Sequence, residues 1–155
     1  MIRMLEAAVL VVALFTDAWG QGAGSRVPDA DAKAIRAVVQ AQLDAFAADD
    51  GPKAFSLASP GIRTQFGIPE VFMAMVREGY AVVYRPASTT FLPAYREAGE
   101  VFQPVRLTDG GGLVWIAHYR MEKQKSGVWR IGGCSVARTG DTAAQAGSAV
   151  PNAFL

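Results

Sequence analysis

The stretch LVWIAHYRMEKQKSGVWRIGGCSV, from Leu113 to Val136, decides the fold of this chain. It contains two runs rich in aromatic and branched residues, and a polar turn that includes Gly127 separates them. This pattern predicts a β-hairpin, because both runs have the composition of strands and the turn between them is short. The rest of the chain is expected to cover one face of the hairpin.

The side chains of the two strands also predict a register. If Met121 faces Trp129, the large side chains gather on one face and His118 lies opposite Gly132. The expected inner face carries Trp115, Tyr119, Met121, Trp129 and Ile131. The expected outer face carries Val114, Ile116, His118, Arg120, Arg130, Cys134 and Val136. Its apolar members predict that a second copy of the chain covers this face, as a homodimer.

The residues before the hairpin divide into a helical half and an extended half. Helical spacing and turn residues predict helices at residues 32–48, 53–59 and 69–79, with one more helical turn at 62–66. Beyond Gly79 the pattern changes, and extended segments are expected at residues 80–85, 89–96 and 100–108. The predicted fold class is therefore α+β, with three N-terminal helices on a curved antiparallel sheet of about four strands. A curved sheet around a long helix forms a cone whose mouth can hold a small molecule.

The N-terminal residues 1–24 have the pattern of a secretory signal peptide. An apolar run from Ala7 to Phe15 follows a positive end, and cleavage is expected near Gly20 or Ala23. The run is too short to span a bilayer, which takes about 20 residues. We therefore expect export to the periplasm or the medium, with no stable membrane anchor after cleavage. A buried N-terminal helix is the alternative.

Composition and the predicted segments define the expected domain boundaries and limit the possible partners and metal sites. Residues 25–30 are expected to be a linker, 31–138 one domain and 139–155 a disordered tail. The formal charge is only +1, so no single-sign field argues for a nucleic-acid partner. The chain has one histidine and one cysteine, which excludes a multi-histidine or cysteine-rich metal site and an internal disulfide. No metal or other cofactor is expected.

Few residues carry a chemical signal. His118 is expected at a subunit contact or half-exposed on the sheet, with a functional histidine as the alternative, and Cys134 as a small buried residue. The adjacent carboxylates Asp49 and Asp50 are interpreted as helix caps rather than as catalytic or metal-binding groups. Gln42 lies within the apolar stripe of the first helix, where it is either a hydrogen-bonded buried amide or a polar group facing a cavity.

No catalytic residue is assigned, and the candidate site is a cavity. Its expected lining combines a single amide with aromatic rings, and a tyrosine and an arginine lie near the rim. These candidates are Gln42, Trp115, Tyr119, Trp129, Tyr84 and Arg85. Such a cavity would bind an apolar or aromatic small molecule. Ordinary core packing is the alternative for Gln42 and the three inner rings.

Three segments carry a resemblance to a known family: QAQLDAF, ASPGIRTQFG and GVWRIGGC. With the surrounding residues 34–136, they resemble the bacterial domain-of-unknown-function family 4864. The resemblance implies membership of the nuclear-transport-factor-2-like, or cystatin-like, superfamily of α+β cones. That superfamily includes steroid isomerases, epoxide hydrolases, dehydratases and structural binding domains, so the resemblance implies a fold rather than an activity.

The sequence thus favours an exported, non-enzymatic domain that binds a small molecule or acts as an accessory protein. The first alternative is a small cone-fold isomerase, dehydratase or hydrolase that uses a buried acid or base. The second is a domain that binds a protein partner through its sheet surface.

Overall fold

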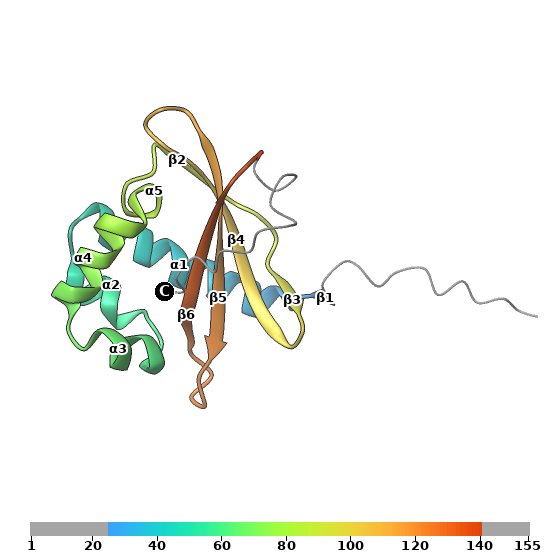
Figure 1. Cartoon of the computed structure of the whole chain (residues 1–155). Coiled ribbons are helices and arrows are strands. Elements are labelled where there is room, and N and C mark those ends of the chain that lie inside the picture. The colour runs from blue at the N-terminus through green and yellow to red at the C-terminus, as the bar shows by residue number, and fades with distance from the viewer. Residues whose placement is uncertain (1–24, 141–155) are drawn as a thin grey trace, which may run out of the picture.

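A computed structural model describes residues 25–140 of the chain. The helices come first in the sequence and the main strands follow, which confirms the α+β class. In Figure 1 the helices lie on one side of the sheet, and the longest of them runs across it. The predicted signal peptide, and all of the predicted tail beyond Gly140, lie outside the described residues and stay predictions.

Five helices are present in the described region, where the sequence predicted three and an extra turn. They are α1 (Asp29–Ala47), α2 (Gly51–Ser56), α3 (Pro60–Phe66), α4 (Pro69–Gly79) and α5 (Ala81–Tyr84). Side chains cap two of the short ones: the Lys53 amide donates to Asp50 at 3.0 Å, and the Ile62 amide donates to Ser59 at 3.4 Å. Proline begins both α3 and α4, where its missing amide hydrogen costs no helical bond.

Helix α5 corrects the expectation of an extended segment at residues 80–85. The amides of Val83 and Tyr84 both donate to the Tyr80 carbonyl at 2.9 Å and close a helical turn there. Val83 is fully buried, and α5 contacts α1. The strand preference of the sequence YAVVYR is therefore overridden by packing against the first helix.

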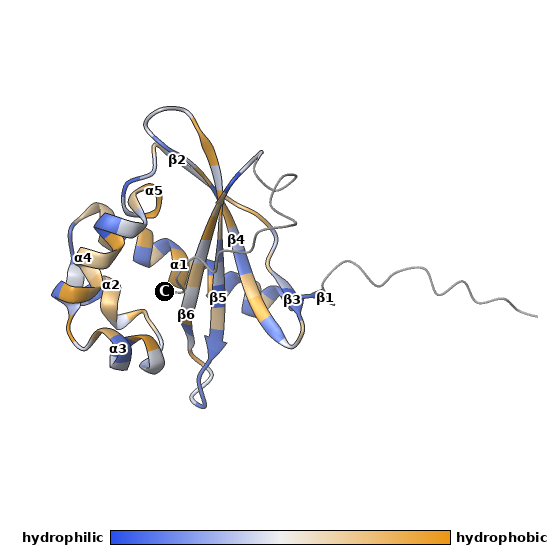
Figure 2. Cartoon of the chain, in the orientation of Figure 1, coloured by the Kyte–Doolittle hydropathy of each residue, from blue (hydrophilic) through white to orange (hydrophobic). Residues whose placement is uncertain are grey.

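The sheet has six antiparallel strands, against about four predicted. They are β1 (Ser25–Arg26), β2 (Ser88–Phe91), β3 (Tyr95–Glu97), β4 (Glu100–Thr108), β5 (Val114–Lys123) and β6 (Trp129–Arg138). Their order is β1-β3-β4-β5-β6, and β2 also pairs with β4. The single predicted segment 89–96 is divided around Pro93 into β2 and β3, which pair with opposite ends of β4. Figure 2 shows hydrophobic residues within the long strands and hydrophilic ones at the β5–β6 turn.

The β5–β6 hairpin is confirmed, but its predicted register is wrong. Near the turn Met121 pairs with Ile131, two residues beyond the expected partner, and a β-bulge follows between Arg120 and Met121. Beyond the bulge Tyr119 pairs with Cys134, and His118 pairs with Ser135 rather than with Gly132. One extra residue on β6 reverses the faces of the residues that follow it. Cys134 and Val136 therefore belong to the inner face, not to the outer face.

The core lies between α1 and the inner face of the sheet. Helix α1 contributes the fully buried Ile35, Val39 and Phe46, and the predicted apolar stripe is thereby confirmed. The inner face of the sheet contributes a matching set: Val105, Leu107, Ala117, Tyr119, Met121, Trp129, Ile131 and Cys134. Phe72 of α4 extends this core through ring contacts of 5.5–6.1 Å with Phe46, Phe55 and Phe66.

The linker between α2 and α3 pairs with β6, the last strand in the sheet order. The Ser59 amide donates to the Ile131 carbonyl at 2.8 Å, and the Ile131 amide donates to the Leu57 carbonyl at 3.0 Å. These bonds occupy backbone groups that an edge strand would otherwise expose to other chains. They also tie the helical half to the sheet beside the bulge.

Candidate functional site

A pocket of about 640 Å³ lies where the end of α4 and α5 face the sheet. The helical side contributes residues 78–82 and Arg85, and the sheet side contributes Asp109, Gly110, Trp115 and Val136. We call it the Trp115 pocket. Its volume is in the range of small-molecule sites, about 300–1,000 Å³. Most of its wall is apolar, with Arg85, Glu78 and Asp109 as its charged members.

Asp109 fixes the orientation of the Trp115 ring. One carboxylate oxygen accepts the backbone amides of Gly111 and Leu113, each at 2.9 Å, and the other accepts the indole Nε1 of Trp115 at 2.8 Å. The bond from Trp115, with those from the two amides, lowers the pKa of Asp109 below its usual value. Asp109 therefore stays ionised near neutral pH and holds one half-buried ring in place.

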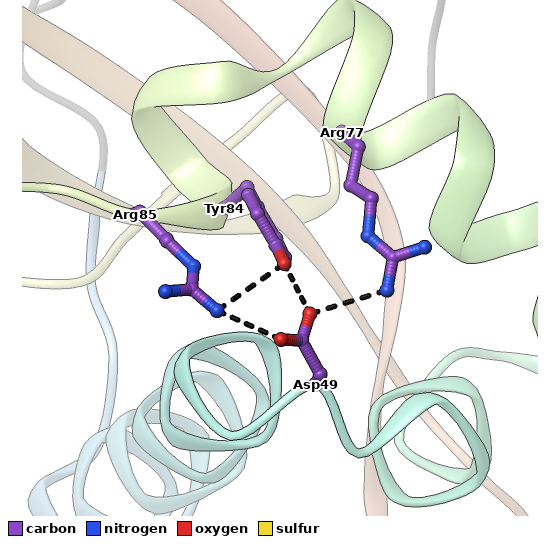
Figure 3. A network of polar contacts seen from close by, with 4 residues as sticks. All are labelled: Asp49, Arg77, Tyr84 and Arg85. Atoms are coloured by element: carbon purple, nitrogen blue, oxygen red, sulfur yellow. Dashed lines mark hydrogen bonds and ion pairs between the residues drawn. The ribbon is translucent and has the colours of Figure 1, made fainter.

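A second set of polar side chains, centred on Asp49, joins the helices at one edge of this pocket. Asp49, between α1 and α2, accepts hydrogen bonds from Tyr84 and from Nη2 of Arg77 at 3.1 Å on one oxygen. Its other oxygen accepts Nη2 of Arg85 at 2.8 Å. Figure 3 shows the two guanidinium groups on opposite sides of the carboxylate. We call these four residues the Asp49 cluster.

Asp49 has an unusual backbone conformation, and its partners in the cluster stabilise its negative charge. Asp49 has a φ of 55°, in the left-handed region that residues with a Cβ rarely adopt. The hydrogen bonds from Tyr84 and Arg77, and the charges of both arginines, lower the pKa of Asp49. Bonds to Tyr84 and Asp49 correspondingly raise the pKa of Arg77 and of Arg85. The carboxylate thus links the α1–α2 junction to α4 and α5 as an anion.

The residues predicted to line a cavity are distributed over several places. Trp115 and Arg85 line the Trp115 pocket, and Tyr84 belongs to the Asp49 cluster. Gln42 and Tyr119 are 1% and 0% exposed and lie in the core. Trp129 is buried and lines a smaller pocket beside the β3–β4 turn. Its Nε1 donates to Asp31 of α1 at 3.0 Å, so the ring does turn toward the longest helix.

Gln42 and Tyr119 share an uncommon feature. Gln42 donates through Nε2 to the Ala54 carbonyl at 3.2 Å. Its side chain is therefore partly satisfied, as the interpretation of a hydrogen-bonded buried amide required. Within the described residues, its Oε1 and the Tyr119 hydroxyl are buried without a hydrogen-bond partner. Such groups cost stability and are rare in native proteins.

The two residues with the most reactive side chains lie apart from the Trp115 pocket. His118 alternates with the buried Ala117 and Tyr119 and so lies on the outer face, where its Nδ1 is 3.2 Å from the Tyr95 hydroxyl. Burial lowers the pKa of His118, against the opposing charge of Glu97. Cys134 is fully enclosed, and burial raises the pKa of its thiol, which makes it a poor nucleophile.

Residues 25–140 contain neither a candidate metal centre nor a helix that could span a membrane. No group of three or more histidine, cysteine, aspartate or glutamate side chains there is placed to hold a metal ion. None of the helices in the same range is long and apolar enough to cross a membrane.

Sequence reasoning missed the carboxylates that organise this region. Asp50 does cap α2, as expected, but Asp49 caps no helix and instead binds Arg77, Tyr84 and Arg85. The sequence predicted no role for Asp109, which orients Trp115. For Asp49 the sequence did contain a signal: a helix needs only one aspartate as its cap, so the second of two adjacent aspartates is available for another role. The signal for Asp109 was its place before three glycines and six residues ahead of a tryptophan.

The fold and pocket define a class: a small α+β domain whose helices cover one face of an antiparallel sheet, with a pocket at one end. The family model for a domain of unknown function, DUF4864, matches residues 28–144, and the chain belongs to this family. The family resemblance noted in the sequence is thereby confirmed. No curated protein and no solved structure matches the chain.

Proposed function

We propose that this protein is an exported, non-enzymatic domain that binds a small, mainly apolar molecule in the Trp115 pocket. The observation that carries the proposal is the indole of Trp115, which Asp109 and the following loop hold at the wall of a pocket of ligand size. A fixed aromatic ring gives a flat ligand a large contact area at little cost in side-chain entropy.

The same geometry favours binding over acid–base catalysis. A general base works best when its pKa is near the working pH, whereas the pKa of Asp109 is lowered and its oxygens already accept three N–H groups. The single histidine lies on the other face of the sheet. An isomerase, dehydratase or hydrolase would have to move its proton with Glu78, the other carboxylate that lines the pocket.

The test uses Trp115 as its own reporter. Replacing Trp19 and Trp129 by phenylalanine leaves Trp115 as the only indole, and replacing Trp19 and Trp115 leaves Trp129. Compounds that raise the melting temperature of the wild type should shift the emission of the Trp115 protein and leave that of the Trp129 protein unchanged. A library that shifts neither melting temperature nor Trp115 emission would overturn the proposal.

We further infer that the sheet curves around α1 as the cones of the nuclear-transport-factor-2-like superfamily do. The order of helices before strands, and the position of α1 across one face of the sheet, support this inference. An experimental structure in which α1 lies on a flat sheet would contradict it. Export has its own test, because cleavage near Gly20 or Ala23 would be visible in the mass of the protein recovered from the periplasm or medium.

The outer face of the sheet supports the proposal of a homodimer. The helices leave this face uncovered, and Phe102, Val114 and Ile116 are only half-buried on it. The patch is smaller than the sequence predicted, because the bulge moves Cys134 and Val136 to the inner face. The same patch would serve a different protein partner, and the mass of the protein in solution distinguishes the two.

A further inference from the structure

Arg85 belongs to both the Trp115 pocket and the Asp49 cluster. Within residues 25–140 it makes hydrogen bonds through Nη2, to Asp49 at 2.8 Å and to the Tyr84 hydroxyl at 3.4 Å, and its guanidinium carbon lies 5.0 Å from the centre of the Tyr84 ring. Within residues 25–140, its Nε and Nη1 have no hydrogen-bond acceptor. In Figure 3 the second terminal nitrogen of Arg85 points away from Asp49. The guanidinium is therefore fixed by one nitrogen and keeps donors for another acceptor.

The charge around Arg85 also favours an anion. Asp49 carries one negative charge but contacts two guanidinium groups, those of Arg77 and Arg85. The Asp49 cluster thus has one positive charge in excess. Since Arg85 is the member that also lines the pocket, this excess lies at the pocket wall. A ligand carboxylate there would accept charge-assisted hydrogen bonds.

The rest of the pocket wall limits how much negative charge a ligand can carry. Trp115, Val82 and Val136 offer apolar surface, while Asp109 and Glu78 add two carboxylates. The oxygens of Asp109 already accept three N–H groups, so it is a poor acceptor for a ligand cation but still repels anions. A single carboxylate at Arg85 is compatible with this wall, and a second one would meet repulsion.

We propose that the Trp115 pocket selects small organic monocarboxylates. The apolar or aromatic body of the ligand lies against Trp115, and its carboxylate accepts hydrogen bonds from the free donors of Arg85. Asp49 acts as a positioning residue that holds the guanidinium at the wall. This inference rests on the proposed function, because it assigns the ligand class of the same pocket.

The experiment compares three probes with the same body and different charge: 3-phenylpropionate, 3-phenylpropanamide and 3-phenylpropylamine. Their dissociation constants are measured by ligand-observed NMR on the full chain and by the emission of the full-length protein in which Trp115 is the only tryptophan. We expect the carboxylate to bind about five- to tenfold more tightly than the amide, as one half-exposed charge-assisted contact would give. The amine should bind no better than the amide.

Two variants separate the role of Arg85 from that of the cluster. Arg85→Gln should reduce the affinity for the carboxylate to that for the amide. Arg77→Gln is the matched control, because it removes the other guanidinium from Asp49 but Arg77 does not line the Trp115 pocket. It should weaken the preference for the carboxylate without abolishing it, because it removes the excess positive charge of the Asp49 cluster but leaves the free donors of Arg85. Circular dichroism of each variant confirms that the fold is retained.

The outcomes distinguish this inference from the proposed function. Equal affinity for all three probes, or tighter binding of the amine, would overturn the carboxylate preference and leave the binding pocket intact. A carboxylate preference that survives in Arg85→Gln would remove Arg85 from its role. If none of the probes binds or shifts Trp115 emission, the pocket does not take such molecules, and this inference is overturned whatever the wider library shows.

Discussion

The buried Tyr119 hydroxyl leads to a testable prediction about the stability of the core. Tyr119 is 0% exposed, and within the described residues its hydroxyl has no hydrogen-bond partner. Burial raises its pKa well above the usual value, so the group is neutral at working pH and its removal changes no charge. Tyr119→Phe keeps the ring and deletes only the unpaired group. We therefore expect this substitution to stabilise the protein.

The size of the effect follows from two opposing terms. An unsatisfied buried polar group costs about 1–3 kcal/mol, and its removal recovers that cost. The void left by one hydroxyl, on the order of 10 Å³, costs about 0.2–0.3 kcal/mol at ~24 cal/mol per Å³. The net gain is about 0.7–2.8 kcal/mol, which corresponds to a rise in melting temperature of roughly 3–11 °C for a domain of this size.

The assay is chemical denaturation followed by far-UV circular dichroism. Tyr119→Phe should raise the midpoint without changing the slope, since the surface exposed on unfolding is nearly the same. Tyr95→Phe is the matched control. Its hydroxyl is bonded to His118, so the same deletion should leave stability unchanged or lower it by about 0.5–1.5 kcal/mol. A lower midpoint for Tyr119→Phe would refute the reasoning, because it would mean that the hydroxyl has a partner.

Gln42 extends this test to a double-mutant cycle. Gln42→Met removes the unpaired Oε1, and the Ala54 carbonyl that loses its bond still accepts the Leu57 amide at 3.3 Å. The gain should be smaller than at Tyr119, about 0.5–1 kcal/mol. If the two residues act independently, the double variant is additive within about 0.5 kcal/mol. A larger coupling would show that both groups bond to one shared partner.

Three further outcomes are expected. Asp50→Ala should lower the free energy of unfolding by about 1 kcal/mol through loss of the α2 cap, whereas Asp44→Ala, at an exposed position of α1, should change it little; equal losses would contradict the capping role. Because burial lowers the pKa of His118 below the usual 6.5, the unfolded chain binds the proton first as the pH falls. The wild type should therefore lose stability from about pH 7 toward pH 5 more steeply than His118→Asn, and parallel profiles would oppose this assignment. Ile116→Glu should convert a dimer to a monomer in light scattering, and a wild type that is already monomeric would exclude the dimer.

The helices and their order could be predicted because their signals are local. The apolar stripe of α1, the aspartate cap of α2 and the prolines that begin α3 and α4 act within one or two turns. Helix α5 could not be predicted in the same way. Its sequence AVVY prefers a strand, and its helical turn depends on packing against α1, which is distant in sequence.

The candidate site was predicted only in part for a similar reason. Trp115 and Arg85 were named from their chemistry and do line one pocket. The Asp49 cluster could not be predicted, because its partners lie 28 to 36 residues away in the sequence and meet only once α4 and α5 fold back. Gln42 and Tyr119 were chosen for their position on inward faces, but periodicity cannot distinguish a core from a cavity wall.

The bulge in the β5–β6 hairpin connects the error in register to the shape of the site. Without an extra residue, strict alternation from Ile131 would place Gly133 and Ser135 inside and Val136 outside. With it, Cys134 meets Tyr119 and Val136 meets Ala117 on the inner face, and Val136 becomes part of the wall opposite α5. Gly132, the extra residue of the bulge, leaves room for the Glu122 side chain, because a Cβ at this position would overlap it. One irregularity in the sheet therefore completes the core beneath α1 and supplies an apolar wall of the pocket.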